Sequence, residues 1–230
     1  MTRIKKKQLT AGIVLLVTFV AVMVVIFMPI FGGGNGLNYL DNLYNSISKG
    51  SAYYIPKVGQ EVEAMASEPV TLRLKFRDAA TAELAVPLFT SAGATSSVDG
   101  DAVAVDGDLK RIFSRCLEDA EAAYHNRGEV LVERYGTDAR PVLHAWWRAL
   151  GAIEKDLNRQ KRFDAAGLTH TVQTKTVECA YNYYGIEAQQ IKDRWGTVLF
   201  SLVFYVLYTI WYGYGIMYLF EGLGFQLTAH

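Results

Sequence analysis

Three polar residues in one helix-forming stretch have the side chains needed to bind a metal ion. Glu118, Glu121 and His125 recur at steps of three and four residues, so successive members stand about one turn apart on a helix. The apolar residues of this stretch centre near Leu109 and Ala120, roughly 105–165° around the helix from the three polar side chains. Carboxylates that bind metals in helical bundles face inward, so we predict a solvated face and no metal.

Four aspartates stand beside two glycines in the middle of the chain and could offer oxygen ligands to calcium: Asp99, Asp101, Asp106 and Asp108. Their spacing does not follow the EF-hand pattern, and no glutamate follows at the distance that such a loop requires. Aspartate and glycine also favour tight turns and helix N-caps. We therefore predict a hairpin turn at Asp99-Gly100, an N-cap at Asp106 or Asp108, and no calcium.

The chain has two cysteines, Cys116 and Cys179. Both fall on apolar helical faces of the segment predicted to lie outside the cytoplasm, where an oxidising environment allows a disulfide. Such a bond closes a loop of about 64 residues and stabilises the fold by roughly 4 kcal/mol in the chain-entropy model. Two separate buried thiols are the alternative, and the sequence leaves both open. No C-x-x-C motif is present.

Catalytic and nucleic-acid-binding functions have little support in the sequence. Histidine occurs four times, and His144 lies away from the apolar face of its predicted helix. The glycines at 32–36 precede no G-K-[ST], so a phosphate-binding loop is not indicated. A formal net charge of zero does not mark the chain as a nucleic-acid binder. We predict no catalytic residues, no cofactor and no nucleic-acid partner.

Two uncharged apolar blocks, at residues 9–31 and 196–220, determine the class of the protein. Each is long enough as a helix to cross a hydrocarbon core of about 30 Å. A cleaved signal peptide is the alternative for the first block. Its apolar run exceeds the about 7–15 residues of such peptides, and no A-x-A-like site follows, which favours an uncleaved anchor.

Cations at the start of the chain predict the orientation of these spans: Arg3, Lys5, Lys6 and Lys7. Positive flanks stay in the cytoplasm. Residues 1–8 and the tail 221–230 are therefore expected inside, and residues 32–195 outside. In a bacterium this is a multi-pass inner-membrane protein with a periplasmic domain.

The central domain is predicted to be mainly helical. Apolar residues at helical spacing cover 37–66, with a break near 50–56, and again 107–195. Between them, 70–106 reads as an α+β insert: a strand at 70–76, a helix at 79–90 that ends near Pro87 or Gly93, and a hairpin of strands at 94–98 and 102–105. We expect an antiparallel helical bundle whose last helix, from Thr169, runs straight into the second span.

The second span is rich in aromatic residues, and four of its residues share one helical face: Tyr205, Tyr208, Tyr212 and Gly215. A tyrosine hydroxyl inside a membrane needs a protein acceptor because lipid offers none. The first span offers only Thr10 and Thr18 as polar side chains. This contrast favours contact with another membrane protein or a second copy of the chain, although packing against the first span is the alternative.

These features together predict a non-catalytic subunit or accessory protein of a membrane complex. An extracytoplasmic ligand-sensing module that signals through a partner is the alternative, because a helix entering the membrane can transmit small shifts. The predicted cytoplasmic segments are too short to hold an output domain. A membrane-anchored enzyme is a third hypothesis, with Arg148 near Trp146 and Trp147 as pocket-lining residues.

Overall fold

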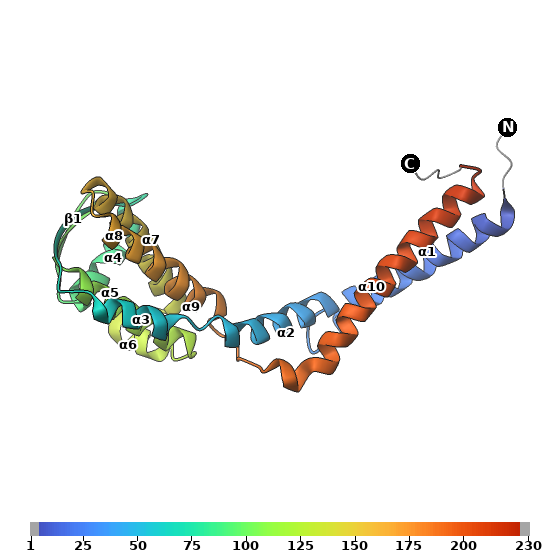
Figure 1. The fold of residues 1–230 in the computed structure, drawn as a ribbon, viewed down its shortest axis with the longest axis horizontal. Helices are drawn as coiled ribbons and strands as arrows, with labels where there is room; N and C mark the ends of the chain where they lie inside the picture. The colour runs from blue at the N-terminus through green and yellow to red at the C-terminus, as the bar shows by residue number, and fades with distance from the viewer. Residues whose placement is uncertain (1–4, 226–230) are drawn as a thin grey trace. The chain divides into compact units, whose positions relative to one another are not determined.

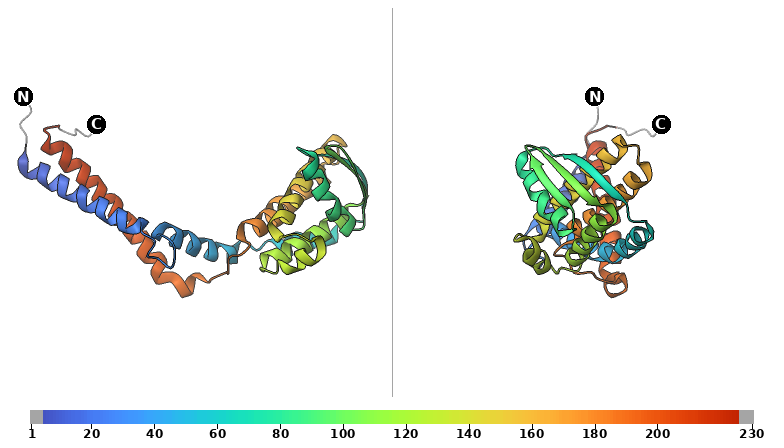
Figure 2. Two further views of the ribbon diagram at one scale, coloured as in Figure 1. Left: turned by 180° about the vertical axis from the view of Figure 1, so that it is seen from behind. Right: turned by 90° about the vertical axis from the view of Figure 1, so that its left-hand side faces the viewer.

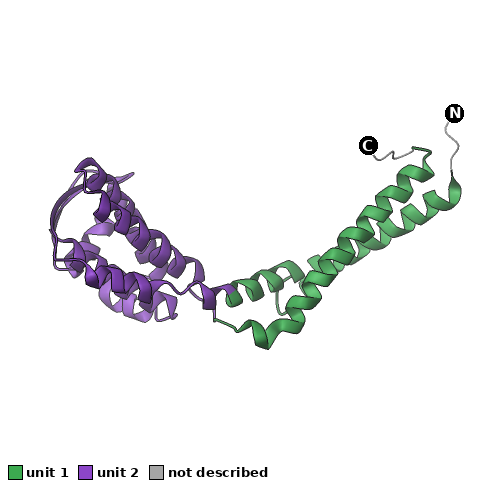
Figure 3. Ribbon diagram, viewed as in Figure 1, with its two compact units in different colours: residues 1–47, 188–230 green, residues 48–187 purple. Residues whose placement is uncertain are grey.

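The structure is a computed structural model that describes residues 5–225 (Figure 1). The chain is mainly helical, with one small sheet, and divides into two compact units. Unit 1 comprises residues 1–47 and 188–230, and unit 2 comprises residues 48–187 (Figure 3). The predicted terminal segments 1–8 and 221–230 lie partly outside the described residues.

Unit 1 is built on two long helices, α1 (Lys6–Phe27) and α10 (Ile191–Gly222). Both are long and apolar enough to cross a membrane, by length and composition. They lie side by side and antiparallel, since the start of α1 contacts the end of α10 (Figure 1). α1 ends before Pro29, where the residue preceding a proline is disfavoured in helical conformation.

α2 (Gly36–Ser51) follows the glycine-rich turn, and Asn35 Oδ1 accepts a hydrogen bond of 2.8 Å from the backbone N–H of Asn38. Its residues up to Ile47 belong to unit 1. There the Tyr44 hydroxyl lies 2.6 Å from Ser201 Oγ of α10. α3 (Ile55–Ala64) begins after residues 52–54, which confirms the predicted break near 50–56.

The sheet of unit 2 has three antiparallel strands in the order β1-β3-β2: β1 (Pro69–Lys75), β2 (Thr95–Asp99) and β3 (Ala102–Asp108). In β1, Val70, Leu72 and Leu74 are buried, and the residues between them are exposed. Gly100 adopts a φ of +63° in the turn between β2 and β3, as the Asp-Gly pair predicts. The strand–helix–hairpin prediction is confirmed.

One face of this sheet is covered by helices, as the side view in Figure 2 shows. α4 (Ala79–Ser91) and α7 (Ala139–Arg159) pack against it. α4 is capped by Asp78, whose carboxylate accepts from the N–H of Thr81 at 2.8 Å. Pro87 lies inside α4 rather than ending it, and the chain turns instead at Gly93, where φ is +77°.

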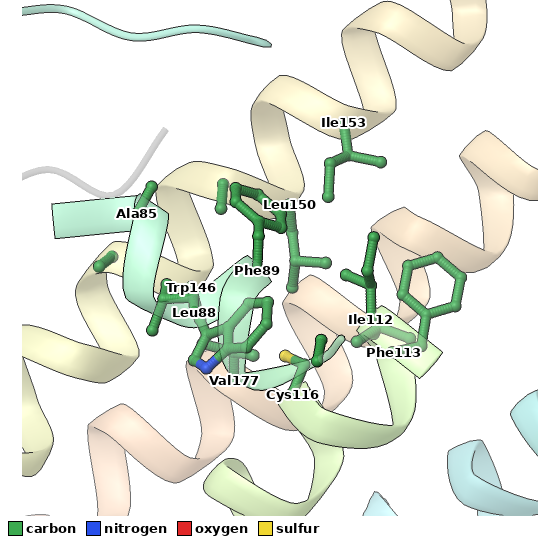
Figure 4. Close-up of a cluster of buried hydrophobic side chains, with 14 of the residues drawn as sticks. Ala85, Leu88, Phe89, Ile112, Phe113, Cys116, Trp146, Leu150, Ile153 and Val177 are labelled. Carbon is green, nitrogen blue, oxygen red and sulfur yellow. The ribbon is translucent and has the colours of Figure 1, made fainter. Parts of the chain in front are cut away.

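The remaining helices of unit 2 are α5 (Leu109–Tyr124), α6 (Glu129–Tyr135), α8 (Phe163–Val172), the π-helical turn η1 (Gln173–Val177) and α9 (Glu178–Tyr183). Asp108 caps α5 by accepting from the N–H of Arg111, as predicted. Trp146, Phe89 and Phe113 are fully buried where α4, α5 and α7 meet (Figure 4). The predicted bundle arrangement of these helices stays a prediction.

The prediction that the last outer helix runs straight into the second span is wrong. η1 and α9 continue α8 only to Tyr183, and residues 184–190 are not helical. Tyr184 is extended, with a ψ of 129°, and Gly185 has a φ of +83°, in the left-handed region that glycine tolerates. The glycine therefore ends the helix, and α10 begins anew at Ile191.

Candidate functional site

Two of the four predicted intramembrane residues face α1 within unit 1. The Tyr208 hydroxyl donates to the main-chain carbonyl of Phe19 at 3.1 Å, and the two rings stack with centroids 4.1 Å apart. Gly215 lies against Leu16, so that a Cβ added at the glycine meets the leucine side chain at 2.9 Å. These two residues therefore hold the helix pair together.

The ends of the pair are joined by closer contacts at two further glycines. A Cβ at Gly12 meets the backbone nitrogen of Leu219 at 2.5 Å, and one at Gly222 clashes with that of Leu9. Small residues let helix backbones approach in this way. Gln8 Nε2 donates to a carboxylate oxygen of Glu221 at 2.8 Å beside this contact. The glycine contacts were not predicted, because the partners of Gly12 and Gly222 lie far away in the sequence.

Main-chain carbonyls of α1 accept from two aromatic side chains of α10. Tyr208, for which the sequence favoured an outside partner, bonds to Phe19 instead. Trp211, which the sequence did not single out, donates from Nε1 to the carbonyl of Leu15 at 3.1 Å. A helical carbonyl has a second lone pair and can accept such a bond in addition to its own helical bond. The side chain of Thr18 instead donates back to Val14 within α1, at 2.8 Å.

The other two predicted residues, Tyr205 and Tyr212, are exposed on α10. Tyr205 is 69% exposed and Tyr212 is 48% exposed, although the Tyr212 ring still lies 5.1 Å from that of Phe19. Contact of Tyr205 and Tyr212 with another protein stays a prediction. A groove of about 500 Å³ lies on another side of α10, and α1 and α10 line it with these residues: Leu15, Leu207, Ile210, Trp211, Tyr214 and Tyr218.

Cys116 and Cys179 are free thiols in unit 2. Cys116 is fully buried in α5 (Figure 4), and burial raises the pKa of its thiol well above the usual range, which keeps it protonated and unreactive. Cys179 is partly buried in α9, where its Sγ lies 3.7 Å from the carbonyl of Thr174. The α5 and α9 helices, which carry the two cysteines, pack together. A disulfide between Cys116 and Cys179 stays a prediction.

A buried polar cluster that the sequence did not indicate centres on Asp119. Its carboxylate is fully buried and accepts hydrogen bonds from Tyr135, from Trp146 Nε1 at 2.8 Å and from the guanidinium of Arg134. A single aspartate on α5 resembles a surface residue, because its three donors come from α6 and α7. Both oxygens of the Asp119 carboxylate accept hydrogen bonds, so the cluster links α5, α6 and α7 in the interior of unit 2.

Lys49 forms a second buried cluster where the chain enters and leaves unit 2. Its side chain is buried, and Nζ donates to the carbonyls of Ile186 at 2.6 Å and Tyr183 at 3.2 Å. Asn126 completes the cluster: Oδ1 accepts from the N–H of Gly185 at 2.8 Å, and Nδ2 donates to Ile186. Burial lowers the pKa of the Lys49 ammonium.

Glu118 and His125 are exposed on α5, as predicted, whereas Glu121 is partly buried, and Glu121 and His125 join a residue from elsewhere in the chain. His125 Nε2 lies 3.1 Å from Glu121 Oε1, and that same oxygen accepts from the Tyr53 hydroxyl. Partial burial and the neighbouring carboxylate raise the pKa of Tyr53 to about 12. Among residues 5–225, no three or more His, Cys, Asp or Glu side chains are grouped to hold a metal ion.

A polar cavity of about 460 Å³ lies at the start of α5, lined by Ser67, Ser91, Ala92, Asp108, Lys110, Arg111, Ser114, Arg115 and Glu118. Most of its charges are already paired: Lys110 lies 3.4 Å from Glu63, and Arg115 binds Glu118. His144 is exposed on α7, as predicted, and its ring stacks with that of Trp147. Neither place brings a nucleophile, a base and an oxyanion site together.

Comparison of the chain with protein-family models, with curated proteins and with solved structures gave no match.

Proposed function

We propose that this chain is a non-catalytic subunit or accessory protein of a membrane complex. α1 and α10 form its anchor, and the exposed aromatic strip of α10 binds a partner membrane protein or a second copy of the chain. The strip consists of Tyr205 and Tyr212, which lie two turns apart on one face of α10. Residues 32–195 lie on the non-cytoplasmic side of the inner membrane, because the basic start of the chain favours the cytoplasm.

One observation supports this proposal above the others: the Tyr205 hydroxyl has no acceptor within residues 5–225 and its side chain is largely exposed, whereas Tyr208 and Trp211 are already bonded to α1. A phenol on the outer face of a spanning helix is stabilised by a partner that supplies an acceptor. The groove beside Trp211 and Tyr214, on another side of α10, gives a partner helix a second, apolar surface to fill.

Site-specific photo-crosslinking in native membranes tests the partner. A benzophenone side chain at position 205 should form a covalent adduct with another polypeptide, and one at position 208 should react within the chain, with α1. Co-expression of two differently tagged copies separates the outcomes, because a self-adduct carries both tags. An adduct to lipid alone at position 205, with a protein that migrates as a monomer after mild extraction, contradicts the proposal.

Orientation is tested separately by proteolysis. Protease added to intact spheroplasts should cleave within residues 32–195 and leave protected fragments that contain α1 and α10. Cleavage only after lysis reverses the proposed topology.

A further inference from the structure

Glu121 Oε2 is the one buried side-chain nitrogen or oxygen without a hydrogen-bond partner among residues 5–225. Its companion Oε1 is saturated by Tyr53 and His125. Native structures leave few buried polar atoms unpaired, and each such atom calls for an explanation such as a bound molecule. An unpaired carboxylate oxygen needs a donor, and a positively charged donor suits it best.

The carboxylate stands at one end of a groove of about 340 Å³ between α3 and α5. Its walls are apolar apart from the Tyr53 hydroxyl and the carboxylates of Glu118 and Glu121, and the residues that form them are Ile55, Pro56, Gly59 and Leu117. Nothing lies within 4 Å of a Cβ placed on Gly59, so this part of the groove is open. The groove therefore combines apolar walls with an acidic part formed by Glu118 and Glu121.

Aromatic rings add to the attraction for a cation at this end. The Tyr53 ring stacks on that of Tyr124 with centroids 5.1 Å apart and meets His125 edge-on at 5.3 Å. Aromatic faces stabilise cations. Arg127 disfavours a cation here, because its positive charge lies close enough to the Tyr53 hydroxyl to act on its pKa. A metal ion is a poorer fit than an N–H donor, since the described residues bring no three His, Cys, Asp or Glu side chains together here to hold one.

We propose that this groove binds a small molecule that joins a protonated amine to a short apolar chain or ring. The ammonium donates to Glu121 Oε2, and the apolar part lies along α3 over Gly59. Tyr53 belongs to the non-helical residues 52–54 and is 36% exposed, so its side chain can move aside to admit the ammonium. The site lies wholly within unit 2 and does not depend on the membrane function proposed above.

Fluorine NMR on the full-length protein in detergent tests this site with two probes that differ only in charge: 4-fluorobenzylamine and 4-fluorobenzyl alcohol. Comparing variants in the same detergent cancels partitioning of the probes into micelles. The expected result is amine binding that weakens at least about tenfold in Glu121→Gln, because the charge of the acceptor is lost. Glu61→Gln removes the same charge from an exposed position of α3 and should leave binding unchanged.

A second variant leaves Glu121 intact and fills the groove. Gly59→Leu should abolish amine binding, and the open space around Gly59 means that the new side chain does not disturb the fold. The proposal is overturned if the alcohol binds as tightly as the amine, if Glu121→Gln binds the amine like the unchanged protein, or if the amine does not bind at millimolar concentration.

Discussion

In the α1/α10 pair of unit 1, two aromatic side chains bond to main-chain carbonyls, whereas the Asp119 cluster of unit 2 joins side chains to one another. Tyr208 and Trp211 donate to carbonyls of α1, and glycines let the two backbones touch. In unit 2, Asp119 instead gathers three side-chain donors from two other helices. The acceptors in the helix pair are main-chain carbonyls, which remain when a side chain of α1 is replaced, except where a glycine is lost. The Asp119 cluster, in contrast, depends on each of its side chains.

The largest effect is expected from Asp119→Ala. It leaves Arg134, Tyr135 and Trp146 without their common acceptor in the interior, and breaking a buried ion pair in this way costs about 3–5 kcal/mol. The free energy of unfolding of unit 2, followed by tryptophan fluorescence in denaturant, should fall by that amount. Glu83→Ala, at an exposed position of α4, is the control. A loss below 1 kcal/mol contradicts the role given to Asp119.

The next effect concerns the helix pair. Gly222→Leu places a side chain against the backbone of Leu9 and should force the helices apart, at a cost of about 1–3 kcal/mol. Gly213→Leu puts the same side chain on the same helix in open space. Cysteines introduced at Gln8 and Glu221, in a background without native cysteines, report the pairing because these side chains touch. Cross-linking should be lost in Gly222→Leu and kept in Gly213→Leu.

A smaller, pH-dependent effect is expected at Asp108. Partial burial acts to raise its pKa, but hydrogen bonds from Ser67, Arg111 and Glu68 lower it below the ordinary value of 3.8. The ionised carboxylate therefore stabilises the fold above that pH, and the contribution is lost as the pH falls through the folded-state pKa. Asp108→Ala should cost about 1 kcal/mol at pH 7 and progressively less in acid.

Urea unfolding at a series of pH values measures the Asp108 effect. Asp106→Ala, at an exposed position in β3, is the control and should show no such pH dependence. A loss of stability in Asp108→Ala that stays constant down to the acid limit excludes the titrating carboxylate as its cause.

The smallest effect is expected from Tyr208→Phe. It removes one hydrogen bond to Phe19 but keeps the stacked ring, and interhelical hydrogen bonds in membranes contribute about 0.6 kcal/mol on average. The same Gln8/Glu221 cysteine pair, titrated with detergent, should show slightly weaker pairing. Tyr205→Phe should leave the pair unchanged, because that side chain is largely exposed. Equal effects of the two variants show that the hydroxyl of Tyr208 is not bonded to α1.

The sequence predicts best what depends on neighbouring residues. The turn at Asp99-Gly100 and the cap at Asp108 follow from local chemistry, and both are confirmed. The helix break at Gly185 was missed because a glycine inside a helix costs only about 1 kcal/mol, which does not by itself end it. The acceptors for Tyr208 were missed because every residue has a carbonyl, whatever its side chain.

Clusters assembled from distant segments could not be predicted. Tyr53 comes near Glu121 only because α3 packs on α5, and the spacing within α5 gave a solvated face instead. The placement of Glu118 and His125 on that outer face was nevertheless right. Tertiary packing, rather than helical periodicity, decides which of these polar residues acquires a neighbour.

The hydrogen bonds of Lys49 bear on whether unit 2 can be removed from the chain or transferred to another protein. Its ammonium ties the first residues of unit 2 to Ile186 among the last, so the two ends of 48–187 are held together. A segment whose ends meet can be removed or transplanted with little loop-closure entropy to overcome. Unit 2 thus has the geometry of an inserted domain, and a short linker should replace it without separating α1 from α10. For the same reason, unit 2 should tolerate circular permutation, in which its two ends are joined and new ends are made at another loop.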